Sequence, residues 1–116
     1  MNPKHVVSKQ HVQHYTWGKI CTAWPLVETA AYTIKQEFMP PHTREELHLH
    51  QEAQQFFFIL NGEAVFYLGE ETIYLREQQG LLVPPGTPHY IANEAGKPLE
   101  FLVFSTPPTA KDRVHL

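Results

Sequence analysis

Three histidines of this chain fall in patterns that suit a metal site. His48 and His50 are two residues apart, so on a β-strand both imidazoles project from the same face of the sheet. Converging imidazoles are typical ligands of first-row transition metals. The spacing alone has little weight, because a chain with eight histidines contains such a pair by chance about half of the time.

The surroundings of the pair strengthen the hypothesis of a metal site. Gln55 follows five residues after His50 and opens a strand-like segment that runs into the turn Asn61-Gly62. Further along the chain, His89 comes just after the proline-stiffened turn Pro84-Pro85-Gly86. A second strand can thus bring a third imidazole to the first two.

Short strands must position these residues, because no segment reads as a long amphipathic helix. Aromatic and β-branched residues gather in strand-length segments, with turn signals such as Asn61-Gly62 and Gly69-Glu70 between them. This pattern predicts an all-β antiparallel sandwich or barrel of jelly-roll type. The expected strands are Val27 to Phe38, Gln55 to Leu60, Ala64 to Leu68, Glu71 to Arg76, Gly80 to Val83, His89 to Ala92 and Leu99 to Ser105.

Length and composition favour one domain over residues 1–116, with a peripheral arm at 1–16 and a core at about 27–105. The chain is 42% hydrophobic and 18% charged, which is typical of a globular domain that needs no disulfides. One cysteine, Cys21, and no membrane-spanning or signal-like segment lead us to expect a cytoplasmic protein. A net charge of −3 without a Lys/Arg cluster argues against nucleic-acid binding.

The two histidine segments resemble the paired motifs of the cupin superfamily, small β-barrels that usually bind one divalent metal. The first family motif reads His-x-His, four residues, an acid, six residues and a glycine, and its positions here are His48, His50, Gln55 and Gly62. The second reads Pro-x-Gly, two residues, His, three residues and Asn, and its positions are Pro84, Gly86, His89 and Asn93. The resemblance covers about Phe38 to Phe104 and implies a double-stranded β-helix barrel.

Three positions depart from the family pattern. Gln55 replaces the usual acid, His42 replaces a glycine six residues before His-x-His, and Gln78-Gln79 replaces a Gly-Asp pair. A neutral amide ligand leaves the charge of a divalent ion uncompensated, so the site should bind metal less tightly and be a stronger Lewis acid. Some small cupins that this chain resembles, including those that linearise unsaturated uronates, have glutamine at this position.

The resemblance therefore implies one divalent transition metal, Ni, Zn, Mn or Fe, held by His48, His50, Gln55 and His89 in a small-molecule pocket. For the three histidines, the alternative is a set of hydrogen-bonded residues in a barrel that has lost its metal. For Gln55, it is an amide that supports a ligand while water takes the fourth position. His42 is expected on the surface, and no role is assigned to the terminal histidines His5, His11, His14 and His115.

Strand alternation divides the aromatic run 56–58 between two faces. If Gln55 faces the cavity, Phe57 and Ile59 do too, either as core or as pocket wall. Phe56, Phe58 and Leu60 would face the other way, as the inner side of a second layer or as part of a homodimer contact, and we expect a homodimer. Four further side chains are candidates for contact with a ligand, without an assigned catalytic role: Tyr32, Lys35, Glu37 and Tyr90.

Three classes of function stay open for this chain. The first is a metalloenzyme that uses Lewis-acid catalysis to isomerise, or open the ring of, a sugar acid or sugar phosphate. The second is a dioxygenase, as in flavonol- or thiol-oxidising cupins, and the third is a non-catalytic module that binds a sugar or metabolite. Gln55 favours the first, and a pocket without titratable groups beyond the ligands would favour the third.

Overall fold

The computed structural model describes residues 5–116, and in this part of the chain it contains β-strands and no helix, which confirms the all-β prediction. Accordingly, no helix in these residues could cross a membrane. The strands are β1 (Tyr15–Trp17), β2 (Cys21–Glu28), β3 (Thr33–Met39), β4 (Thr43–Arg44), β5 (His48–His50), β6 (Gln54–Asn61), β7 (Ala64–Leu68), β8 (Glu71–Leu75), β9 (Gly80–Val83), β10 (His89–Asn93), β11 (Leu99–Thr106) and β12 (Arg113–His115).

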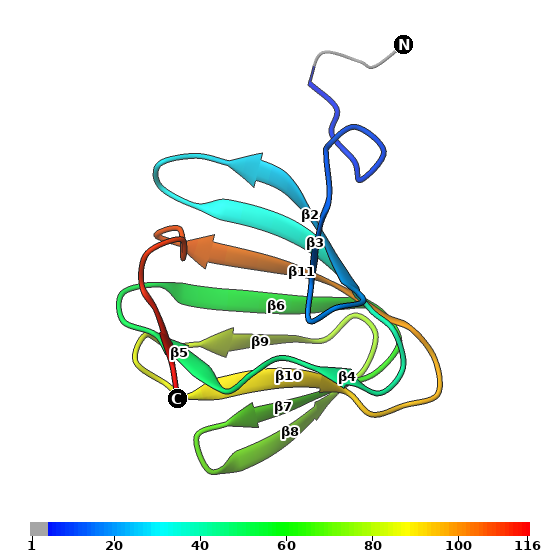
Figure 1. The fold of residues 1–116 in the computed structure, drawn as a ribbon, viewed down its shortest axis with the longest axis vertical. Helices are drawn as coiled ribbons and strands as arrows, with labels where there is room; N and C mark the ends of the chain where they lie inside the picture. The colour runs from blue at the N-terminus through cyan, green and yellow to red at the C-terminus, as the bar shows by residue number, and fades with distance from the viewer. Residues whose placement is uncertain (1–4) are drawn as a thin grey trace.

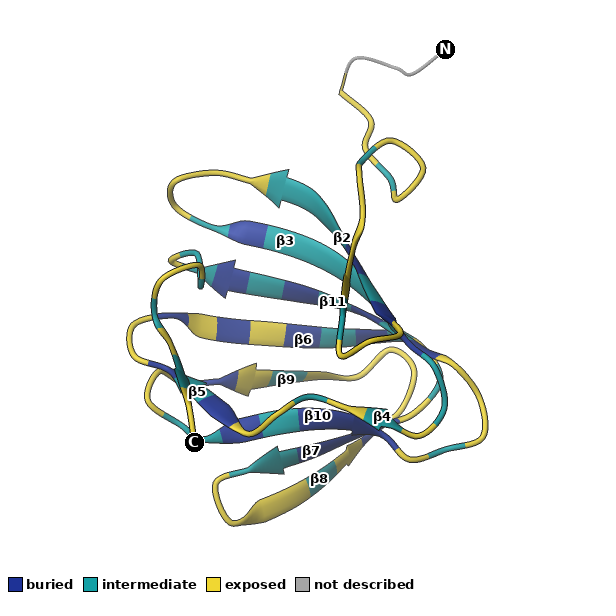
Figure 2. Ribbon diagram, in the orientation of Figure 1, coloured by how far each residue is buried: buried dark blue, intermediate teal, exposed yellow. Residues whose placement is uncertain are grey.

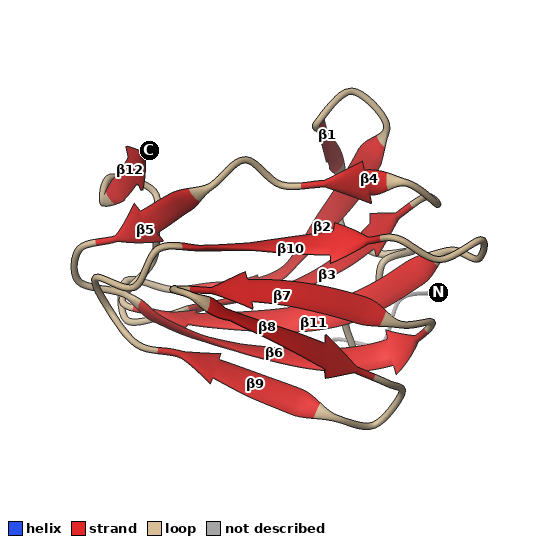
Figure 3. Cartoon of the chain, turned by 90° about the horizontal axis from the view of Figure 1, so that it is seen from below, coloured by secondary structure: helices blue, strands red, loops and turns tan. Residues whose placement is uncertain are grey.

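Two antiparallel sheets face each other (Figures 1 and 3). The first sheet has the strand order β1-β2-β3-β11-β6-β9, and the second has the order β12-β5-β10-β7-β8, with β4 paired to β10. Many neighbours in each sheet are distant in sequence, so the chain crosses repeatedly from one sheet to the other. This is the jelly-roll arrangement that the turn pattern predicts.

The hydrophobic core lies between the inner faces of the two sheets. Burial alternates along β11 and β6, where inward side chains are buried and outward ones are more exposed (Figure 2). The rings of Phe57 on β6 and Phe66 on β7 meet edge to face with centroids 4.8 Å apart, and so join the two sheets. Phe57 and Ile59 are 3% and 0% exposed, which confirms the predicted alternation.

The inner face of the first sheet also carries polar residues. Thr33 on β3, Ser105 on β11 and Gln55 on β6 form one row across three strands, as the strand register shows. Lys35 and Glu37 follow Thr33 at alternate positions of β3, so they share its face of the sheet. This polar part of the inner face is where a site can be built.

The strands extend past both ends of the core range 27–105 expected from the sequence. Residues 15 and 16 of the expected arm belong to β1, which pairs with β2, and β12 lies beyond residue 105. The single strand expected from Val27 to Phe38 is two strands joined by a turn at residues 29–32. Thr29 makes this turn, because its hydroxyl accepts hydrogen bonds from the backbone N–H groups of Ala31 and Tyr32.

The outward row of β6 corrects one of the two readings offered for it. Phe56 is 41% exposed, while Phe58 and Leu60 are half-buried. This face of the first sheet points away from the second sheet, so it is not the inner side of a second layer. The remaining reading, a contact between two copies of the chain, stays a prediction.

Candidate metal centre

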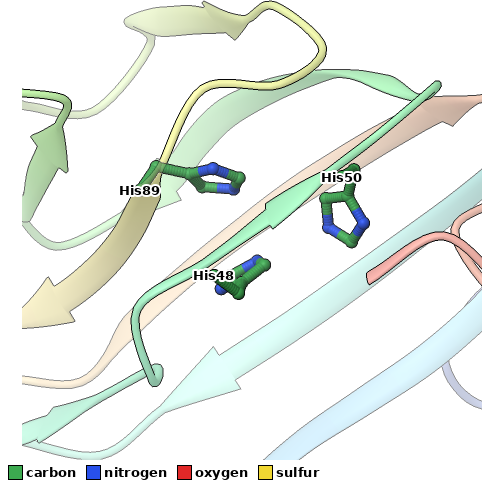
Figure 4. Close-up of side chains that lie close together, drawn as sticks. All are labelled: His48, His50 and His89. Atoms are coloured by element: carbon green, nitrogen blue, oxygen red, sulfur yellow. The ribbon is translucent and has the colours of Figure 1, made fainter. Parts of the chain in front are cut away.

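The two histidine motifs meet through the pairing of β5 with β10. His48 and His50 lie on β5, His89 is the first residue of β10, and His89 pairs directly with His48. Possible ligand atoms of the three imidazoles all lie within 4.8 Å of one another (Figure 4). All three side chains are buried, so the fold brings together three of the four predicted ligands.

Each of these imidazoles has an oxygen acceptor on its Nδ1 atom. His48 Nδ1 lies 2.7 Å from the carbonyl oxygen of Glu46, and His89 Nδ1 lies 2.9 Å from that of Thr87. His50 Nδ1 lies 2.9 Å from Oδ1 of Asp112. Because carbonyl and carboxylate oxygens accept, each Nδ1 carries the proton and each Nε2 keeps a free lone pair.

The environment keeps the histidines neutral, which is the form that ligates a metal. Burial lowers the pKa of His48 to about 3, and the positive charge of Arg113 contributes to this shift. Burial also lowers the pKa values of His50 and His89. His89 Nε2 is buried without a hydrogen-bond partner, as expected for a nitrogen kept free for a metal ion.

Gln55 is held so that its amide oxygen has no protein partner. The side chain is only 8% exposed, and its Nε2 donates a hydrogen bond of 3.0 Å to the hydroxyl of Ser105. Its Oε1 is buried and unpartnered, a costly state unless a further group satisfies it. The donor set, free imidazole nitrogens and a free amide oxygen, therefore fits a divalent transition metal.

Asp112 supports the site and was missed by the sequence reasoning. Its Oδ2 accepts hydrogen bonds from the N–H groups of Ala53, at 2.9 Å, and Glu52, at 3.2 Å. Burial alone would raise the pKa of Asp112, but the hydrogen bonds from Ala53 and His50 lower it overall. No motif marks this residue, because it reaches His50 only through the pairing of β12 with β5.

A cavity of about 450 Å³ opens beside the histidines, a size suited to a small molecule. His48, His50 and Gln55 form part of its wall. The wall also carries charged residues of both signs, which are Lys35, Glu37, Arg44, Glu45, Glu46 and Arg113. Sequence reasoning had singled out Lys35 and Glu37 without knowing their direction, and had not considered Glu45 or Arg113.

The other candidate pocket residues lie elsewhere. Phe57 and Ile59 belong to the hydrophobic core and are not part of this cavity wall, so core filling is the correct reading for both. Tyr90 stacks on Tyr67, with ring centroids 4.5 Å apart, and Tyr32 stacks on Phe104. These two tyrosines do not line the cavity either.

The remaining histidines separate into two groups. His115 lies on β12 and lines the cavity, with its Nδ1 3.5 Å from a carboxylate oxygen of Glu46, although it is close to the end of the chain. His42 is exposed, as expected. His5, His11 and His14 are exposed and lie outside the cavity wall.

Comparison with known proteins agrees with this geometry. The family model described as "Cupin domain" matches residues 36–105, more than half of the chain. The chain belongs to the cupin family. Uncharacterized protein MJ1618 of Methanocaldococcus jannaschii is 29% identical to this cupin over 84 residues, which cover 72% of the cupin and 67% of that relative.

Two solved structures illustrate the shared fold. A predicted oxalate decarboxylase from Thermotoga maritima has a TM-score of 0.81 at 20% identity, covering 89% of this cupin and 99% of that chain. The polyketide cyclase RemF from Streptomyces resistomycificus has a TM-score of 0.82 at 19% identity, covering 98% of this cupin and 87% of that chain. Likeness at these identities is evidence for the fold alone.

Proposed function

We propose that this cupin is a metal-dependent enzyme that isomerises, or opens the ring of, a small anionic and oxygen-rich molecule such as a sugar acid or sugar phosphate. One observation carries the proposal. The possible ligand atoms of three buried histidines lie within 4.8 Å of one another, and two of these histidines line a cavity of about 450 Å³ together with Gln55, whose Oε1 is buried and unpartnered.

His48, His50 and His89 would hold one divalent transition metal, Ni, Zn, Mn or Fe, through Nε2, with Gln55 Oε1 as a fourth ligand. When bound, such an ion supplies Lewis-acid chemistry, which withdraws electrons from a carbonyl or hydroxyl oxygen. The ligands are all neutral, so they leave the charge of the ion uncompensated. The oxygens on each Nδ1 and the hydroxyl of Ser105 hold these side chains in place.

The charge of the cavity wall supports an anionic substrate. Lys35, Arg44 and Arg113 reach the wall from three different strands. Arginine side chains bind carboxylates and phosphates through paired hydrogen bonds. A sugar acid or sugar phosphate offers such an anion together with the oxygens that a Lewis acid can polarise.

The cavity wall also bears on the alternatives. A pocket without titratable groups beyond the ligands would favour a non-catalytic binding module, but Glu37 and Glu45 both line this cavity. A dioxygenase has to oxidise its metal or activate O₂ on it. A neutral ligand set favours the lower oxidation state of the metal and so opposes its oxidation. The amide of Gln55 therefore favours Lewis-acid chemistry over oxygen chemistry.

The experiment begins with elemental analysis of protein purified without added metal. We expect about one divalent ion per chain, and loss of the ion in the double variant His48→Ala/His50→Ala. The double variant His5→Ala/His11→Ala, which changes two exposed histidines outside the cavity, is the matched control. Undiminished metal content in the first variant would refute the metal assignment.

The loaded protein is then screened with uronates, sugar phosphates and flavonols while dissolved oxygen is recorded. We expect turnover of an anionic sugar derivative without oxygen uptake. Oxygen uptake with a flavonol would instead identify a dioxygenase. Binding without turnover of any compound would identify a binding module.

A further inference from the structure

Two carboxylates approach the cavity from opposite sheets. Glu37 lies on β3 in the first sheet and points to the inner face, between Ala23 on β2 and Phe101 on β11 in the strand register. Glu45 follows β4, which belongs to the second sheet, and both residues line the cavity beside His48. The cavity therefore has an acidic group on each side.

The backbone of β10 fixes the position of Glu45. Its N–H donates to the carbonyl oxygen of Ile91 at 3.0 Å, and its carboxylate Oε1 accepts from the N–H of Ile91 at 3.2 Å. The carboxylate is thus held by one strand of the second sheet and cannot turn freely into solvent. Positioning of this kind is a requirement for efficient proton transfer.

Neither carboxylate is placed to serve as a metal ligand or as half of an ion pair. Neither belongs to the cluster in which all possible ligand atoms lie within 4.8 Å of one another. Within residues 5–116, no Lys, Arg or His nitrogen lies within 4.0 Å of either carboxylate. The two groups line the cavity, and neither is held in an ion pair there.

Burial favours the protonated form of both groups. Burial raises the pKa of Glu37 to about 8. The neighbouring Glu45 also raises this pKa, whereas Lys35, the indole N–H of Trp17 and Arg113 lower it. Burial raises the pKa of Glu45 to about 7 against the opposing effects of Arg113 and the N–H of Ile91.

A thiol also lies near the two carboxylates. Burial raises the pKa of Cys21, and both carboxylates add to this shift, so the thiol stays protonated and uncharged near them. Two coupled groups that titrate between pH 7 and 8 share about one proton over that range. One is then able to accept a proton while the other donates one.

We propose that Glu37 and Glu45 are the acid–base residues of this cavity and that they isomerise an anionic 2-hydroxy aldehyde or ketone. This inference rests on the function proposed above, and it adds the substrate class and the residues that move protons. The substrate fills the space between the two carboxylates, and its anionic group lies toward Lys35 and Arg113 on the wall.

The proton transfers balance without any further reactant. The ionised carboxylate takes the proton from the substrate carbon next to the carbonyl, and the electrons of that C–H bond form a carbon–carbon double bond. The π electrons of the carbonyl bond take the proton of the other carboxyl group, which makes a hydroxyl. In the second half of the reaction, the first carboxyl group gives its proton to the former carbonyl carbon. The second carboxylate removes the proton from the hydroxyl on the neighbouring carbon, so the carbonyl has moved by one carbon.

The first test measures the two carboxyl groups directly, with carbon-13 NMR of protein labelled at the glutamate side-chain carboxyl carbon. We expect two signals that titrate above pH 6, one of which disappears in Glu37→Gln and the other in Glu45→Gln. In Glu45→Gln the midpoint of Glu37 should fall by about one pH unit, because a neighbouring negative charge is gone. Midpoints below pH 5 for both groups would overturn the proposal.

The matched control for this titration is Glu100→Gln. Glu100 is also partly buried and lies on β11 of the same sheet, but on the outer face, where it accepts a hydrogen bond from Gln36. This variant should leave both midpoints unchanged. The titration is recorded with and without bound metal, so it decides the state of the pair even where metal binding fails.

The second test measures proton transfer with D-glucuronate, whose open form is a 2-hydroxy aldehyde with a carboxylate. Metal-loaded wild-type protein in D₂O should exchange the hydrogen at carbon 2 for deuterium, followed by proton NMR. Glu37→Gln and Glu45→Gln should each slow exchange by about 100-fold or more, with unchanged metal content, and Glu100→Gln should match wild type. The glutamine side chains resemble protonated carboxyl groups in shape. Glu37→Ala and Glu45→Ala therefore serve as a second pair of variants, in which the group is removed.

The outcomes separate this inference from the proposed function. Wild-type exchange rates in both Glu→Gln variants, or no exchange by the loaded wild-type protein, would overturn the acid–base assignment. Retention of metal in His48→Ala/His50→Ala would refute the proposed function, whereas the titration of the pair would still stand as measured.

Discussion

His50 donates its Nδ1 proton to Asp112 across 2.9 Å, although 62 positions separate the two residues in the sequence. The same carboxylate accepts the N–H groups of Glu52 and Ala53, in the loop that joins β5 to β6. Gln55 stands near the start of β6, directly after this loop. One side chain thus orients one predicted ligand and fixes the path of the chain to another.

Loss of the Asp112 carboxylate should weaken metal binding. We expect Asp112→Ala to reduce affinity by about 10- to 100-fold, because the ring of His50 loses the acceptor that orients it. Asp112→Asn should lose less, since its amide oxygen can still accept from Nδ1. A chelator-competition titration measures both, with the exposed neighbour variant Lys111→Ala as control, and equal affinity in all four proteins would contradict the role given to Asp112.

Gln55→Glu tests the fourth ligand. If the amide oxygen is a ligand, the glutamate adds a negative charge about 2 Å from the ion, so metal affinity should rise. Activity of a Lewis-acid enzyme should fall, because the added charge weakens the pull of the ion on a substrate oxygen. A dioxygenase limited by metal oxidation should keep or gain activity.

The readout for Gln55 is chelator competition together with turnover. Ser105→Ala serves as a charge-neutral comparison, because it removes the hydrogen bond to Nε2 while the amide stays. The Ser105→Ala variant should lower metal affinity slightly. Unchanged affinity in Gln55→Glu would place Gln55 outside the ligand set and leave the fourth position to water.

Glu37 should make stability depend on pH. Burial raises the pKa of Glu37 to about 8 from its ordinary value of 4.5, so over this range the folded state holds a proton that the unfolded state releases. The contribution of Glu37 to the free energy of unfolding is therefore fully present below about pH 4.5 and is lost as the pH rises towards 8. Glu37→Gln should be more stable than wild type at pH 8.5, by about 1 kcal/mol or more, and should gain less at pH 5.

Thermal unfolding of the metal-free proteins at both pH values checks this, since about 1 kcal/mol corresponds to at least about 4 °C for a domain of this size. Glu100→Gln is again the comparison on the outer face. A stability difference between Glu37→Gln and wild type that is the same at pH 5 and pH 8.5 would be inconsistent with a buried, protonated Glu37.

We propose that the protein is a homodimer formed through the outer face of the first sheet. Phe56 on β6 and Leu82 on β9 are direct cross-strand partners, and they are 41% and 51% exposed. Phe58 lies beside Phe56 on the same face, with ring centroids 6.3 Å apart. A two-fold contact is the commonest way to cover such an apolar surface.

Light scattering at micromolar concentration should give a mass of about twice the 13.4 kDa of one chain. The double variant Phe56→Glu/Leu82→Glu should be a monomer. Tyr74→Ser, which changes a side chain that is 72% exposed on β8 of the other sheet, should remain a dimer. A wild-type mass near that of one chain would reject the dimer.

Gln78 occupies a backbone conformation that favours glycine. Its φ is +67°, and it stands where the cupin motif usually has glycine; His42, the other such position, has a φ of +62°. Left-handed backbone costs a residue with a side chain about 1 kcal/mol or more, partly offset because glycine loses more entropy on folding. Gln78→Gly should thus raise the free energy of unfolding, measured with denaturant, by up to about 1 kcal/mol. An equal gain in Gln78→Ala would exclude backbone strain as the cause.

The sequence carries enough information for the fold and for the three histidines. Turn residues such as Asn61-Gly62 separate the strands, and the His48–His50 spacing with the His89 turn sets which side chains share a face. The turn at residues 29–32 went unrecognised, because it contains neither glycine nor proline and depends on the hydroxyl of Thr29.

The acidic groups of the site were harder to find. The direction of Glu37 was undecided, because polar residues occupy both faces of β3, as Gln36 and Lys35 show. Glu45 and Asp112 come to the site only through strand pairings between distant segments, namely β4 with β10 and β12 with β5. Such pairings leave no spacing pattern within either segment.

The bond between His50 and Asp112 also sets an order of events during protein synthesis. All the predicted ligands lie at or before residue 89, so they leave the ribosome earlier than the carboxylate that orients one of them. At a translation rate of about 5–20 residues per second, a delay of seconds separates the two. An ion captured by the nascent chain would meet a His50 that lacks its Asp112 acceptor, because that contact forms only when β12 pairs with β5.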